Sequence, residues 1–229
     1  MFCPICNSES TEMPINGLNR NMHKCLHCGH IYASGETHDY SERGIEYFNQ
    51  NCNHQGITST DDSPAWDNYT NSRITKLVNH NMLLLCPIVE IGCLEGQVLR
   101  RIKNRGKVVV GYETNKDVAA LNEFVRPYPI TEEKEKLEVG GVFSFHVFEH
   151  LSNPVKTINK IYDMLIPSGK VFIEVPIETD WWNPDHIQFY NSHSLTIMLS
   201  KFKSIQMTGD HFINCHGMLC EQIQVSAEK

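Results

Sequence analysis

The chain has 229 residues and a formal net charge of −7, with 41% hydrophobic and 21% charged residues. This length suits one ordinary domain with a small additional module, and the composition excludes wholesale disorder. The acidic balance argues against a general binder of nucleic-acid phosphates, so no nucleic-acid partner is expected.

The first residues, MFCPIC, do not resemble a secretory signal, because no basic segment precedes an apolar one. No apolar run reaches the length of a membrane span, so no membrane partner is expected either. Nine cysteines without an export signal predict metal ligands and free thiols in place of a disulfide framework. We therefore expect a cytoplasmic protein, whose oligomeric state the sequence leaves open.

The first motif along the chain is a pair of C-x2-C sequences, formed by Cys3, Cys6, Cys25 and Cys28. Two intervening residues let one turn present both sulfurs to an ion, and two such turns complete a tetrahedron. The spacing predicts a zinc ribbon over residues 1–35, with a structural Zn²⁺ that supplies folding energy. The alternative is four unrelated buried cysteines.

Three histidines lie close to the second cysteine pair, namely His23, His27 and His30. One of them could replace a cysteine as a ligand. Because four cysteines already close a tetrahedral site, we expect the three histidines at the surface.

Residues 36–80 are predicted to form a helical connector or a lid. Ser63 is expected to cap a helix that has Pro64 in its first turn. Five apolar or aromatic residues are spaced to share one helical face: Trp66, Tyr69, Ile74, Leu77 and Val78. A connector is the simpler interpretation. In a lid, the residues to examine would be Tyr47, Trp66, Tyr69 and Arg73.

Residues 81–229 alternate between strand and helix patterns. Strands are expected at LLLCPIVEIG, KVVVGYE, GVFSFHVF, KVFIEVP, SIQMTGD and EQIQVSAEK, and helices at GQVLRRIKNR, KDVAALNEFV, NPVKTINKIYDML and SHSLTIMLSKF. Apolar strands that alternate with helices predict an α/β fold with a doubly wound, mostly parallel sheet. Ligands of such sheets bind outside the carboxyl ends of the strands.

Glycines and carboxylates follow the first two of these strands. The first ends in VEIGCLEG, and the dinucleotide fingerprint G-x-G-x-x-G is absent, which argues against NAD or FAD. Glu113 follows the second strand and is well placed to accept hydrogen bonds from ribose hydroxyls. The alternative for Glu113 is a solvated surface side chain.

Four segments, VEIGCLEG, GYETN, FHVFEHLSNP and LIPSGKVFIEVP, occur in this order. Together they resemble the class I S-adenosylmethionine-dependent methyltransferases over residues 85–228, and DHIQFYNSHSLTIMLSKF resembles a later segment of the same subgroup. A four-cysteine ribbon before such a core is similar to bacterial sugar C- and O-methyltransferases. The resemblance implies a Rossmann-like, seven-stranded methyltransferase domain over residues 81–229, with S-adenosylmethionine as its cofactor.

The resemblance also implies roles for individual residues. Glu90, Gly92, Cys93 and Gly96 would line the methionine part of the cofactor. Glu113 would bind the ribose, and Phe145 and His146 would lie beside the cofactor, although a structural role for His146 is an equal alternative. The sequence departs from the family pattern at Leu94 and Ser168, where the family favours glycine.

Methyl transfer to oxygen or carbon requires a group that removes a proton from the acceptor, and a His or Glu with a shifted pKa can do this. His150, next to Glu149, is the first candidate for this general base, and His186 is the second. Capping of the following helix is the alternative for Glu149.

The resemblance therefore implies methyl transfer to an oxygen or carbon of a small hydroxylated substrate, with a sugar or nucleotide-sugar as the substrate class. The alternative is a non-catalytic protein of methyltransferase fold whose ribbon binds a partner. A methyltransferase of RNA or protein lies between the two. Cofactor binding separates the enzyme from the scaffold.

Overall fold

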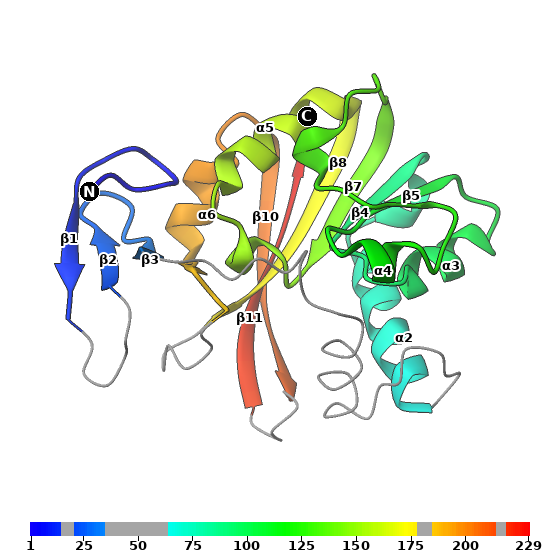
Figure 1. Ribbon diagram of the computed structural model, residues 1–229, viewed down its shortest axis with the longest axis horizontal. Coiled ribbons are helices and arrows are strands. Elements are labelled where there is room, and N and C mark those ends of the chain that lie inside the picture. The colour runs from blue at the N-terminus through cyan, green and yellow to red at the C-terminus, as the bar shows by residue number, and fades with distance from the viewer. Residues whose placement is uncertain (15–20, 35–63, 178–184, 214–218) are drawn as a thin grey trace.

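A computed structural model describes residues 1–14, 21–34, 64–177, 185–213 and 219–229 (Figure 1). Most of the expected connector, including Tyr47 and Ser63, lies outside the described residues, as does the side chain of Trp66.

Seven strands form the main sheet, in the order β10-β11-β8-β7-β4-β5-β6 (Figure 1). Their bounds are β4 Ile88–Ile91, β5 Val109–Tyr112, β6 Val125–Arg126, β7 Val139–Phe145, β8 Leu165–Ile177, β10 Lys203–Ile213 and β11 Leu219–Glu228. The five strands from β6 to β8 run parallel, and β11 is antiparallel to both of its neighbours. This confirms the predicted α/β class and the Rossmann-like, mostly parallel seven-stranded sheet.

Both faces of this sheet are buried, which explains the nearly continuous apolar runs of its central strands. In β7, Val142 packs in one core cluster with Ile161, whereas its neighbour Phe143 packs in a second cluster with Leu99 and Leu77. Successive side chains of a strand point to opposite faces, so helices must cover each face. The helices are α2 Pro64–Asn79, α3 Gln97–Lys103, α4 Lys116–Ala119, α5 Pro154–Met164 and α6 Ser192–Met198.

The helix expected over KDVAALNEFV is wrong in its second half. Asn115 caps α4 by accepting a hydrogen bond from the N–H of Val118, but the helix ends at Ala119. Val125 then belongs to β6, which pairs in parallel with β5 at the edge of the sheet. Pairing with the sheet edge overrides the local helical pattern, because burial and backbone hydrogen bonds outweigh intrinsic propensity.

Helix α2 begins at the predicted Pro64 and buries part of the expected face. Ile74 and Leu77 are buried in the core, whereas Val78 is 50% exposed, so Val78 does not share the buried face of the other two. Thr70 is buried instead, one helical turn before Ile74. The helix therefore packs on the domain core near the carboxyl ends of the parallel strands (Figure 1).

The N-terminal strands form a second, four-stranded sheet that includes a strand of the core domain. Strands β1 Ser10–Met13, β2 Asn21–Cys25 and β3 Ile31–Ser34 are antiparallel, and β3 also pairs with β9 Gln188–Phe189. We call β1 to β3 and their cysteine turns the ribbon. Shared backbone hydrogen bonds make the ribbon continuous with the core.

Two of the three histidines expected at the surface are buried, so that expectation is wrong for His23 and His30. His30 has no exposed surface, and its Nε2 lies 2.8 Å from Oε1 of Gln188. Burial lowers the pKa of His30 to about 4, so the ring is neutral. The docking of β9 on the ribbon, which has no local signal in the sequence, covers this side chain.

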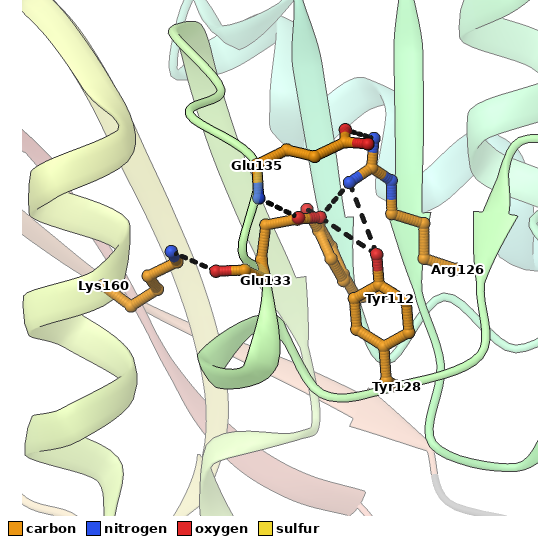
Figure 2. A network of polar contacts seen from close by, with 6 residues as sticks. All are labelled: Tyr112, Arg126, Tyr128, Glu133, Glu135 and Lys160. Atoms are coloured by element: carbon orange, nitrogen blue, oxygen red, sulfur yellow. Dashed lines mark hydrogen bonds and ion pairs between the residues drawn. The ribbon is translucent and has the colours of Figure 1, made fainter.

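A polar network fixes the chain between β6 and β7 (Figure 2). Its centre is the carboxylate of Glu133, which forms an ion pair with Arg126 and accepts hydrogen bonds from the hydroxyls of Tyr112 at 2.7 Å and Tyr128 at 3.2 Å. Burial would raise the pKa of Glu133, but Tyr112 and Arg126 hold it at about 2. The carboxylate is therefore ionised and fully engaged at neutral pH.

The same network reaches α5 and the next turn. Lys160 donates to the backbone carbonyl of Glu133 at 2.7 Å, and Glu135 pairs with Arg126 at 2.8 Å (Figure 2). These contacts tie the edge strand β6 to a helix that covers the sheet. They do not involve the predicted site residues, and we assign them a structural role.

We predict that Tyr112→Phe lowers the free energy of unfolding by about 1.5–3 kcal/mol, because it removes a buried hydrogen bond to a charged carboxylate. Tyr128→Phe is the matched control and should cost less, since its hydrogen bond to Glu133 is longer. Urea denaturation at pH 7 measures both variants. Equal losses would contradict the importance assigned to the Tyr112 hydroxyl.

Candidate active site

The turn after β4 forms the first wall of the site. Gly92 and Gly96 have positive φ angles of 65° and 77°, and Leu94 between them has a φ of 49°. A side chain on Gly92 would meet Cγ2 of Val147 at 2.2 Å, so glycine is also required by packing. Leu94 adopts the left-handed conformation despite its side chain, which explains why the family pattern favours glycine at this position.

Glu113 holds this turn from the end of β5. Its carboxylate accepts hydrogen bonds from the backbone N–H of Leu94 at 3.1 Å and of Asn115 at 2.9 Å. The side chain is buried, and burial raises its pKa. Each oxygen has a second lone pair, so the carboxylate can accept further hydrogen bonds from a ligand. The alternative of a solvated surface side chain is wrong for Glu113.

A small cavity lies between this turn and α2. It is lined by Tyr69, Thr70, Arg73, Glu90, Cys93, Leu94, Glu95, Gln97 and Val98. Helix α2 therefore forms one wall of the cavity. The predicted residues Glu90 and Cys93 lie on the opposite wall, in the strand and turn of the core domain.

An arginine and a buried glutamic acid line opposite walls of this cavity. The guanidinium of Arg73 lies 4.2 Å from the ring centre of Tyr69 and 4.7 Å from that of Phe145. Glu90 is 1% exposed, and among the described residues its Oε2 has no hydrogen-bond partner. Burial raises the pKa of Glu90 to about 8. A cationic ligand group beside Glu90 would restore its charge, and an anionic group would suit Arg73.

A row of alternating charges runs from α2 to the end of β7. Nζ of Lys76 lies 2.7 Å from Glu174, whose Oε1 lies 3.4 Å from Nε2 of His146. Nδ1 of His146 lies 3.4 Å from Oε1 of Glu149. We call Lys76, Glu174, His146 and Glu149 the charge row. Burial opposes a charged imidazole, but the two carboxylates raise the pKa of His146 to about 9.

Glu149, His150 and His186 form a compact cluster beyond this row. Their potential ligand atoms all lie within 4.8 Å of one another, and the two imidazole ring centres are 4.7 Å apart. Burial would raise the pKa of Glu149, but His146, His150 and His186 hold it at about 2. The structure thus brings together the three residues that are predicted for catalysis.

Two backbone contacts build this cluster from distant segments. The ring nitrogen Nδ1 of His150 lies 2.9 Å from the carbonyl oxygen of Asp185, and the N–H of Ile187 donates to the carbonyl of Glu149 at 2.8 Å. The short helix η4, Phe148–His150, is thereby joined to the segment that leads into β9. Helix α5 is capped by Asn153, whose side chain accepts a hydrogen bond from the N–H of Lys156. Glu149 lies on η4 and is not the cap, so the capping alternative for Glu149 is wrong.

The four N-terminal cysteines also converge. Sγ of Cys3 lies 3.7 Å from Sγ of Cys28, and Sγ of Cys6 lies 3.4 Å from Cys25 and 3.6 Å from Cys28. Thiolates bound to one ion at about 2.3 Å would lie about 3.8 Å apart in an ideal tetrahedron. Backbone N–H groups of Ile5 and His27 point to these sulfurs at 3.4 Å. The arrangement fits a tetrahedral thiolate site.

Most of the predicted residues therefore fall into three places: the turn and cavity after β4, the cluster at η4 and the cysteine turns. Phe145 and His146 lie apart from these, beside Arg73 and within the charge row respectively. Packing also requires glycine at position 96, because a Cβ there would lie 2.8 Å from the ring of Phe124. Lys76 and Glu174 were not among the predicted residues, and Arg73 and Tyr69 were predicted only for a lid. A carboxylate inside the apolar strand KVFIEVP was the available signal for Glu174.

A family model described as a methyltransferase domain matches residues 86–202. A search of curated proteins found no matching sequence. Among the described residues, no helix is both long and apolar enough to cross a membrane.

Solved structures of the same fold are distant in sequence. An S-adenosylmethionine-dependent methyltransferase from Archaeoglobus fulgidus is 16% identical with a TM-score of 0.58, and the match covers 70% of this chain and 94% of that one. The N-methyltransferase NodS from Bradyrhizobium japonicum, solved with S-adenosyl-L-homocysteine, is 11% identical with a TM-score of 0.57, over 79% of this chain and 97% of that one. At these identities the likeness establishes the fold.

We predict that Gly92→Ala lowers the free energy of unfolding by about 2–4 kcal/mol, through left-handed strain and a clash with Val147. Gly106→Ala is the matched control, because Gly106 has a φ of 79° but nothing within 4 Å of an added Cβ. The control should lose only about 1–2 kcal/mol from backbone strain. Thermal and urea unfolding of both variants measure the difference, and identical losses would remove the packing argument.

Proposed function

Because the chain belongs to the methyltransferase domain family and is thus a methyltransferase, we propose that it moves a methyl group from S-adenosylmethionine to an oxygen or carbon of a small hydroxylated substrate. A sugar or nucleotide-sugar is the substrate class that the sequence resemblance favours. The observation that carries the proposal is the cavity between α2 and the Gly92–Gly96 turn, with Glu90 and Arg73 in its lining and Glu113 bonded to the backbone of that turn. The cytoplasmic location, inferred from cysteine usage, and the division into residues 1–35, 36–80 and 81–229 remain part of this proposal.

The charges around the cavity fit this donor. The methionine part of S-adenosylmethionine carries an ammonium and a carboxylate, which match the buried Glu90 carboxylate and the Arg73 guanidinium. We assign the ribose hydroxyls to Glu113, at the end of the second strand of the parallel set. Gly92, Cys93 and Gly96 would border the methionine part, and Phe145 and His146 would lie beside the cofactor.

The remaining chemistry concerns the acceptor. When bound, S-adenosylmethionine supplies a methyl group on a positively charged sulfur. Transfer forms one bond from the acceptor to the methyl carbon and breaks the carbon–sulfur bond, whose electron pair stays on sulfur. The acceptor also loses a proton, and we assign its uptake to His150, with His186 as the second candidate. Glu149 lies beside both rings and would stabilise a protonated imidazole.

We assign a structural Zn²⁺ to the cysteine cluster. Sulfur–sulfur distances of 3.4 to 3.7 Å support one tetrahedral ion held by four thiolates. Such a site has no open coordination position, so the ion would stabilise the ribbon and take no part in the reaction. The pairing of β3 with β9 supports a role for the ribbon in holding the segment that carries His186.

Calorimetric titration with S-adenosyl-L-homocysteine tests the proposed donor. We expect one-to-one binding, and Arg73→Met should weaken it by about ten- to a hundredfold, since a charge-assisted hydrogen bond is worth about 1.5–3 kcal/mol. Arg105→Met, on an exposed arginine outside the cavity, is the control and should bind as the wild type does. A folded protein that does not bind this ligand would refute the proposal.

A screen of sugar nucleotides, simple sugars and amine acceptors then identifies the substrate, since neighbours of this fold include a protein described as an N-methyltransferase. In this screen, His150→Ala should retain S-adenosyl-L-homocysteine binding but lose methyl transfer.

The zinc assignment has its own test in metal analysis of the purified protein. Cys28→Ser should lose one equivalent of zinc relative to the wild type and should unfold at a lower temperature, because metal binding contributes folding free energy. Cys86→Ser is the control, because Cys86 is exposed and lies outside the cluster. An unchanged zinc content in Cys28→Ser would argue for four metal-free thiols.

A further inference from the structure

The cluster of Glu149, His150 and His186 has the composition of a metal site. Building on the proposed function, we propose that these three side chains bind one divalent transition-metal ion, which in turn binds an oxygen atom of the methyl acceptor. Two imidazoles and one carboxylate form a ligand set that suits ions such as Mn²⁺, Fe²⁺, Co²⁺ or Zn²⁺. Mg²⁺ and Ca²⁺ fit less well, because they prefer oxygen ligands throughout.

The distances support a single ion. Ligand atoms bound to one ion at about 2.1 Å lie about 3.0–4.2 Å from one another, depending on the geometry. The three potential ligand atoms of this cluster already lie within 4.8 Å of one another. Side-chain movements of about 1–2 Å would therefore close the site around an ion.

The burial of Glu149 is the second, independent observation. Its carboxylate is 1% exposed, and among the described residues neither oxygen has a hydrogen-bond partner. The nearest cation is His146, at 3.4 Å from Oε1, which is longer than a normal hydrogen bond. Burying a carboxylate without hydrogen bonds is costly; His146 offsets part of this cost, and a coordinated ion would offset more of it.

The surroundings also orient the ligands. The Nδ1–H of His150 can donate to the carbonyl of Asp185 at 2.9 Å, which leaves Nε2 as the nitrogen with a lone pair. Metal-bound histidines are usually fixed in this way by a hydrogen bond from the other ring nitrogen. The hydrogen bond from Ile187 to the Glu149 carbonyl fixes the position of His186 relative to η4.

Three protein ligands would leave coordination positions for substrate. An acceptor hydroxyl bound there would have a lowered pKa and would release its proton to solvent more readily. A second oxygen on the neighbouring carbon could occupy another position, which favours vicinal diols or hydroxy-carbonyl compounds as acceptors. With an ion bound, the Nε2 lone pair of His150 would be engaged, so the acceptor proton would go to solvent and His150 would serve as a ligand in place of a general base.

Titration of the full chain, brought beforehand to one zinc ion per chain so that only the four-thiolate site is filled, with Mn²⁺, followed by the electron paramagnetic resonance signal of the free ion, tests the site. Mn²⁺ is chosen because it favours oxygen and nitrogen ligands over the thiolates of the ribbon. We expect one Mn²⁺ per chain, and His150→Gln and His186→Gln should each weaken binding by about tenfold or more. His193→Gln is the matched control, since His193 is exposed and outside the cluster, and should bind as the wild type does.

Because Glu149 is buried, Glu149→Gln can fail to fold, and the two histidine variants carry the test in that case. A folded wild type that takes up no Mn²⁺, or histidine variants that bind it unchanged, would overturn the metal site. Titration with S-adenosyl-L-homocysteine in the same samples separates the two proposals. Binding of S-adenosyl-L-homocysteine without Mn²⁺ uptake would support the proposed methyl donor and contradict the metal site. Mn²⁺ uptake without binding of S-adenosyl-L-homocysteine would support the metal site and contradict the proposed donor.

Discussion

Burial of the Glu149 carboxylate is the constraint on which the arrangement of this site depends. An isolated charge in the protein interior is expensive, so the surrounding elements must compensate it. His146 lies next to this carboxylate, Glu174 next to His146, and Lys76 next to Glu174, so that opposite charges alternate along the charge row. The row joins α2, β8, the end of β7 and η4. The two walls of the site are therefore linked electrostatically as well as by packing.

The row also explains an unusual backbone conformation. His146 has a φ of 54°, which costs energy for any residue with a side chain. This conformation turns the chain directly after β7, so that both ring nitrogens of His146 lie within 3.4 Å of a carboxylate. A strained backbone conformation of this kind persists only where many surrounding contacts hold it in place, and such conformations are typical of functional sites.

The ribbon contributes to the same site through β9. Strand β3 pairs with β9 on one side, while the residue before β9, Ile187, bonds to η4 on the other. Gln188 connects the two further, because its side chain contacts His30 at 2.8 Å and the carbonyl of Leu151 at 3.0 Å. Through these hydrogen bonds, the folding of a cysteine-rich module more than a hundred residues away in sequence restrains the position of the catalytic candidates.

Local patterns predicted much of the fold. The alternation of apolar strands and helices identified six of the seven strands of the main sheet, and the C-x2-C spacing predicted the convergence of four cysteines. The segment FHVFEHLSNP indicated Glu149 and His150, because ionisable side chains seldom end a buried strand unless they face a site. Leu94 and Ser168 were recognised as departures from a glycine pattern, and both have positive φ angles.

The sequence by itself determined the class of the sheet, the cysteine turns and the candidate residues, because hydrophobic period and short-range spacing are local properties. Only the tertiary structure decided that Val125 joins the sheet edge, that His30 is buried against β9, and that Arg73 faces Glu90 across a cavity. It also decided that His186 meets Glu149 and His150. These contacts join segments that are far apart in the chain. They form because the packed surfaces bury apolar area and pair charges, and a local sequence pattern does not contain this information.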